Sequence, residues 1–164
     1  MSEENSIDVY SFEKENREYF ERCLPPRPAH YFDSEGFKEI TRELLREQEN
    51  HDVYMHLIRD AQGTMVGRIN LSVLEDDRKT AELGYRIGEN VTNLGYASEA
   101  VKLVLEKAFT TYGLHKIIAG TATDNLISQR VLLKNGFTFS RIIENDFQMH
   151  NEWIHTAVFE IRNL

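Results

Sequence analysis

Hydrophobic and polar residues alternate along the middle of the chain, from Thr80 to Ile87, which is typical of a strand with one buried face. The apolar positions of this alternation are Leu83, Tyr85 and Ile87. Residues 88–95 follow with two glycines and two asparagines, which tolerate unusual backbone angles. Apolar residues spaced three and four apart then predict an amphipathic helix from about Tyr96 to Tyr112. The chain therefore has a strand, a turn-rich loop and a long helix at its centre.

The same patterns predict the elements on either side. Alternation favours further strands at Ile7–Ser11, Val53–Arg59, Met65–Leu74, His115–Thr121, Phe137–Ile143 and Trp153–Ile161. Helical spacing favours helices at Phe12–Leu24, after a cap at Asp33, and at about Asn125–Asn135 with Thr123 or Asp124 as its cap. These patterns predict an α/β (α+β) fold of about seven strands and four helices. Because a helix joins the fourth and fifth strands, that pair should be parallel in a mostly antiparallel sheet.

Length and composition narrow the class of protein. The chain has 164 residues, which suits a single domain over residues 1–164. Its net charge of −8 argues against direct nucleic-acid binding and is compatible with a basic partner. The single cysteine, Cys23, excludes a disulfide within the chain and suits a reducing compartment. No apolar run is long enough for a bilayer and the N-terminus is unlike a secretory signal, so we expect a cytoplasmic protein that does not bind membranes.

The loop and the start of the central helix have the features of an anion site. The first N–H groups of a helix lack intrahelical acceptors, and the helix dipole places partial positive charge there. Gly95 has no side chain, and Ala97 and Ser98 have small ones, so a pyrophosphate could approach the amides closely. The segment matches neither GxGxxG nor GxxxxGK[ST], which gives no support to a dinucleotide or a P-loop site. The alternative is that Gly95 only forms a turn.

Two motifs together resemble the Gcn5-related N-acetyltransferase (GNAT) superfamily. They are ELGYRIGENVTNLGYASEAV, residues 82–101, and NLISQRVLLKNGF, residues 125–137. The chain is most similar to the branch of the ribosomal-protein N-terminal acetyltransferases RimJ and RimL, and the resemblance covers nearly its whole length. It implies a GNAT fold whose parallel strands splay apart where the acetyl group sits. It also implies acetyl transfer from acetyl-CoA to a primary amine, by direct attack of the amine on the thioester.

The resemblance also assigns the residues that would bind acetyl-CoA. The pyrophosphate would be held by the loop amides of Asn93, Leu94, Gly95, Tyr96, Ala97 and Ser98, although the family's usual Gln or Arg is replaced by Thr92. The backbone around Ile87 would bind the pantetheine arm like an added strand, and the amide of Asn125 would bond it. Arg130, in preference to Lys102 or Lys134, would meet the 3′-phosphate. The alternatives are that Asn125 caps its helix and that the basic residues lie on solvated faces.

Catalysis needs a neutral amine and a protonated leaving thiolate. Many GNAT enzymes supply the thiolate's proton from a tyrosine at the position of Leu132, which cannot do so here. The RimL-like branch implies Ser128 instead, with water sharing the role; alternatively, Ser128 is a small packed residue. Glu82 is the candidate base or ammonium-binding group, with a solvated strand glutamate as the alternative. The sequence has no metal-ligand spacing on one clear face, so we expect no metal.

The acceptor is an amine, and the resemblance suggests the N-terminal α-amine of a protein, ribosomal or otherwise basic. Two alternatives stay open: a small-molecule amine such as a polyamine, an amino sugar or an amino-acid-like compound, and a CoA-binding module without catalysis. The acceptor side should be formed by the N-terminal helices, the loop Pro25–Pro28 and the segment Glu144–Trp153. Aromatic closure there, by Tyr31, Phe32, Phe147 or Trp153, would favour a small amine. The sequence leaves a monomer and a homodimer open.

Overall fold

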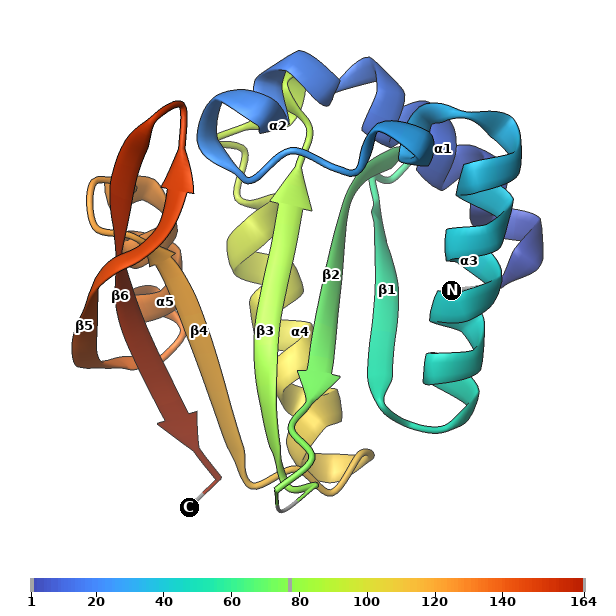
Figure 1. Cartoon of the computed structure of the whole chain (residues 1–164). Helices are drawn as coiled ribbons and strands as arrows, with labels where there is room; N and C mark the ends of the chain where they lie inside the picture. The colour runs from blue at the N-terminus through green and yellow to red at the C-terminus, as the bar shows by residue number, and fades with distance from the viewer. Residues whose placement is uncertain (1, 77, 164) are drawn as a thin grey trace. The chain divides into compact units, whose positions relative to one another are not determined.

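A computed structural model describes residues 2–76 and 78–163 of the chain (Figure 1). The α-helices are α1 (Ser6–Glu15), α2 (Arg17–Cys23), α3 (Ser34–Glu49), α4 (Tyr96–Thr110) and α5 (Leu126–Lys134). The strands are β1 (Val53–Arg59), β2 (Met65–Val73), β3 (Thr80–Ile87), β4 (Lys116–Ala122), β5 (Thr138–Met149) and β6 (Glu152–Arg162). Short 3₁₀ turns lie at Glu3–Asn5, Ala29–Phe32 and Glu89–Val91.

The strands form one mixed sheet in the order β1-β2-β3-β4-β6-β5. As the sequence predicts, the two strands joined by the long helix, β3 and β4, are parallel. Their paired residues are Thr80 with Lys116, Ala81 with Ile117, and Glu82 with Ile118, which are the first three residues of each strand. By contrast, β4 pairs with β6 from Lys116 to Ala122 in antiparallel register. The predicted mixed fold with one parallel pair is therefore confirmed.

The described residues form two compact units. The first comprises residues 2–70 and 85–96, and the second comprises residues 71–76, 78–84 and 97–163. Figure 1 shows that α3 lies beside β1 in the first unit, and that β5 and β6 form the long hairpin at the C-terminal end of the second. The expectation of a single domain stays a prediction.

Each unit has its own buried apolar residues. In the first, Val9, Tyr31 and Phe37 form a cluster against which five partly buried side chains pack: Tyr10, Phe32, Ile40, Leu57 and Met65. The Tyr31 and Phe37 rings meet edge to face, with centroids 5.5 Å apart. In the second unit, α4 buries the stripe predicted from its sequence, with Val101, Val104 and Ala108 each 2% exposed or less. Helix amphipathicity therefore accounts for α4 directly.

The structure corrects the N-terminal assignments. The predicted strand at Ile7–Ser11 is wrong, because these residues belong to α1. The buried positions of α1 are Val9, Phe12 and Glu13, and their spacing of three and four is that of a helix face. The predicted helix from Phe12 to Leu24 is two helices divided at Asn16. The described chain therefore has six strands and five α-helices instead of about seven and four.

The C-terminal hairpin is longer than predicted. β5 runs to Met149, well beyond the predicted end at Ile143, and pairs with β6 through two irregularities in register. Most of its side chains are exposed, so burial does not distinguish the two faces of this strand. Within residues 2–76 and 78–163, we find no helix with the length and apolarity needed to cross a membrane.

Candidate active site

The loop after β3 turns the chain sharply into α4. Asn93 and Gly95 both have left-handed backbone angles, with φ of +62° and +91°. Asparagine and glycine adopt this region more readily than other residues. A Cβ atom added at Gly95 would meet no atom within 4 Å, so the space beside it is open. The predicted pyrophosphate-binding residues 93–98 thus lie together at the N-terminus of a 15-residue helix, where backbone N–H groups lack intrahelical acceptors.

The loop is anchored to the N-terminal helices within the first unit. The Oδ1 atom of Asn16, at the junction of α1 and α2, accepts a hydrogen bond of 2.9 Å from the backbone N–H of Glu89. The Glu89 side chain also forms an ion pair with Arg22 of α2. The N–H of Gly88 donates to the carbonyl of Val66 in β2 at 2.9 Å. These contacts fix the start of the loop against α1, α2 and β2.

The end of β3 runs very close to β2 in the same unit. A Cβ atom added at Gly67 of β2 would lie 2.6 Å from the carbonyl oxygen of Arg86 and 2.8 Å from the Cδ1 atom of Ile87. Only glycine fits this approach without movement of the neighbouring backbone. Ile87, the candidate for binding the pantetheine arm, is half-buried at the C-terminal end of β3.

The second motif places Asn125 and Ser128 in the first turn of α5. Asn125 is the N-cap, and its Oδ1 atom accepts a hydrogen bond of 3.1 Å from the backbone N–H of Ser128. The predicted caps, Thr123 and Asp124, are therefore wrong. Ser128 is half-buried, whereas Leu132, one turn further on, is 1% exposed and belongs to the core. The predicted roles of Asn125 towards pantetheine and of Ser128 towards the thiolate stay predictions.

A contact between α4 and α5 was not predicted from the sequence. The Nδ2 atom of Asn135, the C-cap of α5, donates a hydrogen bond of 3.2 Å to the hydroxyl oxygen of Ser98 in the first turn of α4. Ser98 thus has a structural contact besides its predicted place near the pyrophosphate. This hydrogen bond joins Ser98 of the first motif to Asn135 of the second motif within the second unit.

The remaining candidates are exposed. Glu82 is exposed on β3 and forms the last residue pair with β4, opposite Ile118. Arg130 of α5 and Lys102 of α4 are also exposed. The roles of Glu82 as a base and of Arg130 as a phosphate ligand stay predictions. No group of His, Cys, Asp or Glu side chains within the described residues could hold a metal ion.

Sequence reasoning missed a buried carboxylate among three arginines, all in the first unit. Glu13 of α1 is 1% exposed, and its carboxylate accepts hydrogen bonds from Arg27 at 2.9 Å and from Arg68 and Arg86 at 3.1 Å each. Burial alone would raise the pKa of Glu13, but the charges of Arg27, Arg86 and Arg68 outweigh burial and lower this pKa. Burial lowers the pKa of Arg86. Glu13 therefore connects α1, as an ionised group, to the loop after α2 and to the strands β2 and β3.

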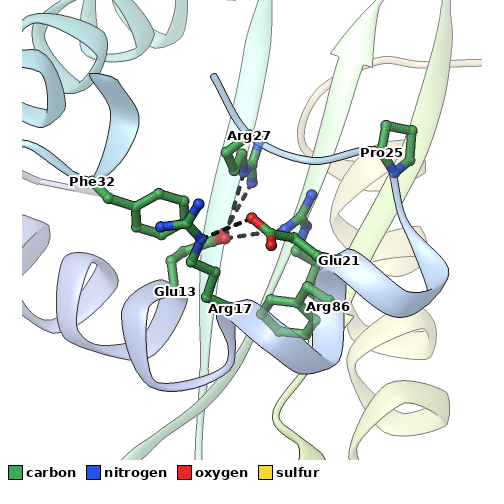
Figure 2. Close-up of a pocket in the computed structure, with 8 residues that line it drawn as sticks. Glu13, Arg17, Glu21, Pro25, Arg27, Phe32 and Arg86 are labelled. Atoms are coloured by element: carbon green, nitrogen blue, oxygen red, sulfur yellow. Dashed lines mark hydrogen bonds and ion pairs between the residues drawn. The ribbon is translucent and has the colours of Figure 1, made fainter. Parts of the chain in front are cut away.

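Three residues of this cluster, Glu13, Arg27 and Arg86, line a pocket, which is shown in Figure 2. We call it the arginine pocket; its lining residues are Glu13, Arg17, Phe20, Glu21, Pro25, Arg27, Phe32 and Arg86. Arg17 stacks over the Phe32 ring at 4.2 Å and pairs with Glu21 at 2.8 Å. The sequence held one signal for the pocket, since Glu13 is a charged residue directly beside Phe12 on the apolar face of its helix.

A profile of the acetyltransferase (GNAT) domain family matches residues 3–138. The chain belongs to this GNAT family. The relative YjcK of Bacillus subtilis (strain 168), named as a probable N-acetyltransferase, is 30% identical over 153 residues, which are 92% of this chain and 84% of YjcK. The family resemblance found in the sequence is thereby confirmed, and the GNAT protein described here is an N-acetyltransferase.

Two solved structures show the same fold. The ribosomal-protein-S5-alanine acetyltransferase of Vibrio fischeri has a TM-score of 0.92 at 18% identity, covering 99% of this chain and 90% of that chain. The spermidine N-acetyltransferase of Vibrio cholerae, in complex with CoA and spermine, has a TM-score of 0.82 at 17% identity, covering 99% and 92%. At these identities the likeness shows the GNAT fold alone, so it does not identify the acceptor of this chain.

Proposed function

We propose that this GNAT protein transfers the acetyl group of acetyl-CoA to the α-amine at the N-terminus of a protein. The open, left-handed turn at Gly95, which leads into the N-terminus of α4, is the observation that supports acetyl-CoA binding. An anion that approaches these amides meets no side chain at position 95, and the helix dipole favours negative charge there. This open turn supports the proposed pyrophosphate site.

The proposed chemistry gives each predicted residue a role in binding or catalysis, with Arg130 meeting the 3′-phosphate. The amides of residues 93–98 hold the pyrophosphate, while the backbone at Ile87 and the amide of Asn125 hold the pantetheine arm. The neutral amine attacks the thioester carbonyl, and the carbon–sulfur bond breaks as the amide forms. Ser128, with water, gives a proton to the leaving thiolate, and Glu82 accepts the proton that the amine loses.

The protein acceptor is supported by the resemblance of the two sequence motifs to the branch of the ribosomal-protein acetyltransferases RimJ and RimL. A small amine is the second candidate, because a spermidine acetyltransferase shares the fold and the net charge of −8 would attract a polyamine. The module without catalysis is not supported, because the family is one of acetyltransferases.

The deciding experiment measures CoA thiol release with N-terminal peptides, spermidine and amino sugars at matched concentrations. We expect the highest kcat/KM with a peptide. A preference of about 100-fold for any small amine, which corresponds to about 2.7 kcal/mol of transition-state discrimination, would replace the protein acceptor with that amine.

A further inference from the structure

The arginine pocket has a surplus of positive charge. Its lining contains three arginines (Arg17, Arg27 and Arg86) and two glutamates (Glu13 and Glu21). Arg68 adds a fourth positive charge through its contact with Glu13, so four positive and two negative charges leave a net charge of +2 in a chain whose total is −8. Arg27 uses two of its nitrogens for Glu13, and Arg68 and Arg86 use one each. Since each guanidinium has five N–H donors, most of the cluster's donor capacity is not directed at Glu13. Partly buried cations in excess of their counter-ions favour a further anion.

Aromatic rings hold the arginines in place. Arg17 lies over Phe32 at 4.2 Å, Arg86 over Phe20 at 5.1 Å and Arg27 over Tyr31 at 5.0 Å. Such stacking restricts the rotamers of long side chains before a ligand arrives, and this lowers the entropy lost on binding. Of the three arginines around Glu13, Arg27 has the most exposed side chain, at 28%, compared with 15% for Arg86 and 12% for Arg68. Arg27 is therefore the donor around Glu13 that a ligand reaches most readily.

The arginine pocket adjoins the end of β3, where the pantetheine arm is proposed to bind. Arg86 lines the pocket and directly precedes Ile87, whose backbone is proposed to bind the pantetheine arm. On the other side of Ile87, Gly88 lies against α1: a Cβ atom added there would be 3.2 Å from the Phe12 ring. All these residues belong to the first unit. The pocket also involves α1, α2 and the Pro25–Pro28 loop, where the sequence predicts the acceptor side.

We propose that the arginine pocket binds a carboxylate of the acceptor, so that the preferred substrates are anionic amines and not polyamines. The inference rests on the proposed acetyl transfer. A planar carboxylate matches the fork of a guanidinium and accepts two N–H bonds from it. A polyamine would instead place like charges against Arg27 and Arg86. The positive charge of the pocket thus favours an anionic acceptor, whereas the net charge of the whole chain suggests a polyamine.

The carboxylate has two possible sources, and matched acceptors distinguish them. One is an acidic side chain next to the N-terminal residue of a peptide, and the other is the free α-carboxylate of an amino acid. The first set of acceptors is alanyl-glutamate, alanyl-glutamine and alanyl-lysine, each extended by one glycinamide. The second set is free alanine and alaninamide. In at least one set, we expect the acceptor with the additional carboxylate (the glutamate peptide or free alanine) to have a kcat/KM about 10-fold above that of its neutral partner. The difference should arise mainly from KM and should decrease as the salt concentration rises.

Substitution of Arg27 tests whether the pocket causes this preference. Arg27→Gln should bring the ratio of kcat/KM for acidic and neutral acceptors close to one, while Arg27→Lys, which keeps the charge but loses the fork, should give an intermediate ratio. The matched control is Arg42→Gln, which removes one exposed arginine from α3 of the same unit and should leave the ratio unchanged. Equal rates with acidic and neutral acceptors in both sets in the wild type would overturn the proposal. A preference for the lysine peptide without a preference for free alanine over alaninamide would do the same.

A binding measurement separates this inference from the proposed function. Calorimetric titration of the glutamate peptide and of free alanine in the presence of CoA needs no turnover. We expect one of these acidic ligands to bind the wild type at least about 10-fold more tightly than Arg27→Gln does, equivalent to about 1.4 kcal/mol. If no amine is acetylated but this difference is found, the acetyl-transfer proposal fails and the carboxylate site stands. Equal binding by both proteins would exclude the site, provided that acetyl-CoA raises the Tm of each protein and so shows that both are folded.

Discussion

The side-chain oxygen of Asn125 accepts a hydrogen bond from the backbone N–H of Ser128, and both residues are thereby held in the first turn of α5. The two residues singled out by the second motif are therefore coupled through the cap. A substitution at Asn125 changes the start of the helix as well as any contact that its amide makes with acetyl-CoA. Variants that separate these effects are needed to assign its role.

The first prediction concerns Asn125. Asn125→Asp keeps an oxygen that can cap α5 but removes the amide donor, so we expect a Tm near that of the wild type and weaker binding of acetyl-CoA, by about 10-fold. Asn125→Ala loses both functions, and the loss of the cap should lower the free energy of unfolding by about 1 kcal/mol. Thermal unfolding and calorimetric titration measure the two effects. Wild-type affinity in Asn125→Asp would show that the residue only caps the helix.

The second prediction concerns the leaving thiolate. Ser128→Ala should lower kcat by about 10-fold to 100-fold, at or below the lower end of the usual range for a general acid, because water shares the proton transfer. The dissociation constant for acetyl-CoA should stay within about two-fold, since Ser128 acts on the transition state. Ser128→Thr, which keeps a hydroxyl, is the control and should retain more activity. An unchanged kcat in Ser128→Ala would remove this residue from the mechanism.

The third prediction tests the pyrophosphate site at Gly95. Any side chain at this position is strained by its φ of +91°, but space is open around it. Gly95→Ala and Gly95→Glu share the strain, and only Gly95→Glu adds a negative charge beside the amides. We therefore expect acetyl-CoA to raise the Tm of Gly95→Ala but not that of Gly95→Glu. Equal shifts in both variants would contradict the placement of the pyrophosphate.

The fourth prediction follows from the lowered pKa of Glu13. Because this pKa lies below the ordinary value of 4.5, the carboxylate adds stability that is fully present above about pH 4.5 and is lost as the pH falls through the lowered value. Glu13→Gln should lower the free energy of unfolding at pH 7 by about 3–5 kcal/mol, because buried guanidiniums lose their counter-ion. The variant should also lose less stability than the wild type between pH 5 and pH 3.

Urea unfolding at pH 7, 5, 4 and 3 tests the fourth prediction. Glu35→Gln is the matched control, because Glu35 is an exposed glutamate paired with Lys38 on the surface of α3. It should have little effect on the midpoint at any of these pH values. Parallel pH profiles for Glu13→Gln and the wild type would mean that Glu13 does not contribute to acid sensitivity.

Sequence patterns predicted the helices and strands that have one buried face, but they did not predict contacts between residues far apart in the sequence. The bounds of β1 and β3 were predicted correctly, because their alternation is long and coincides with burial. Five residues at Ile7–Ser11 were too few to distinguish a strand from the helix α1. The partners of Glu13 in β2 and β3 lie 55 and 73 residues away, and periodicity has no information about such distances. The Ser98–Asn135 contact was missed for the same reason.

The close approach at Gly67 limits how this protein can evolve. A methyl group at that position would collide with the carbonyl of Arg86, and the strand would have to move together with Arg86 and Ile87. One substitution would thus disturb both the proposed acceptor pocket and the proposed pantetheine strand. In a saturation library selected for acetylation, we expect glycine alone to survive at position 67. Acceptor specificity can then change through substitutions at Arg27, and not through substitutions at Gly67 of β2.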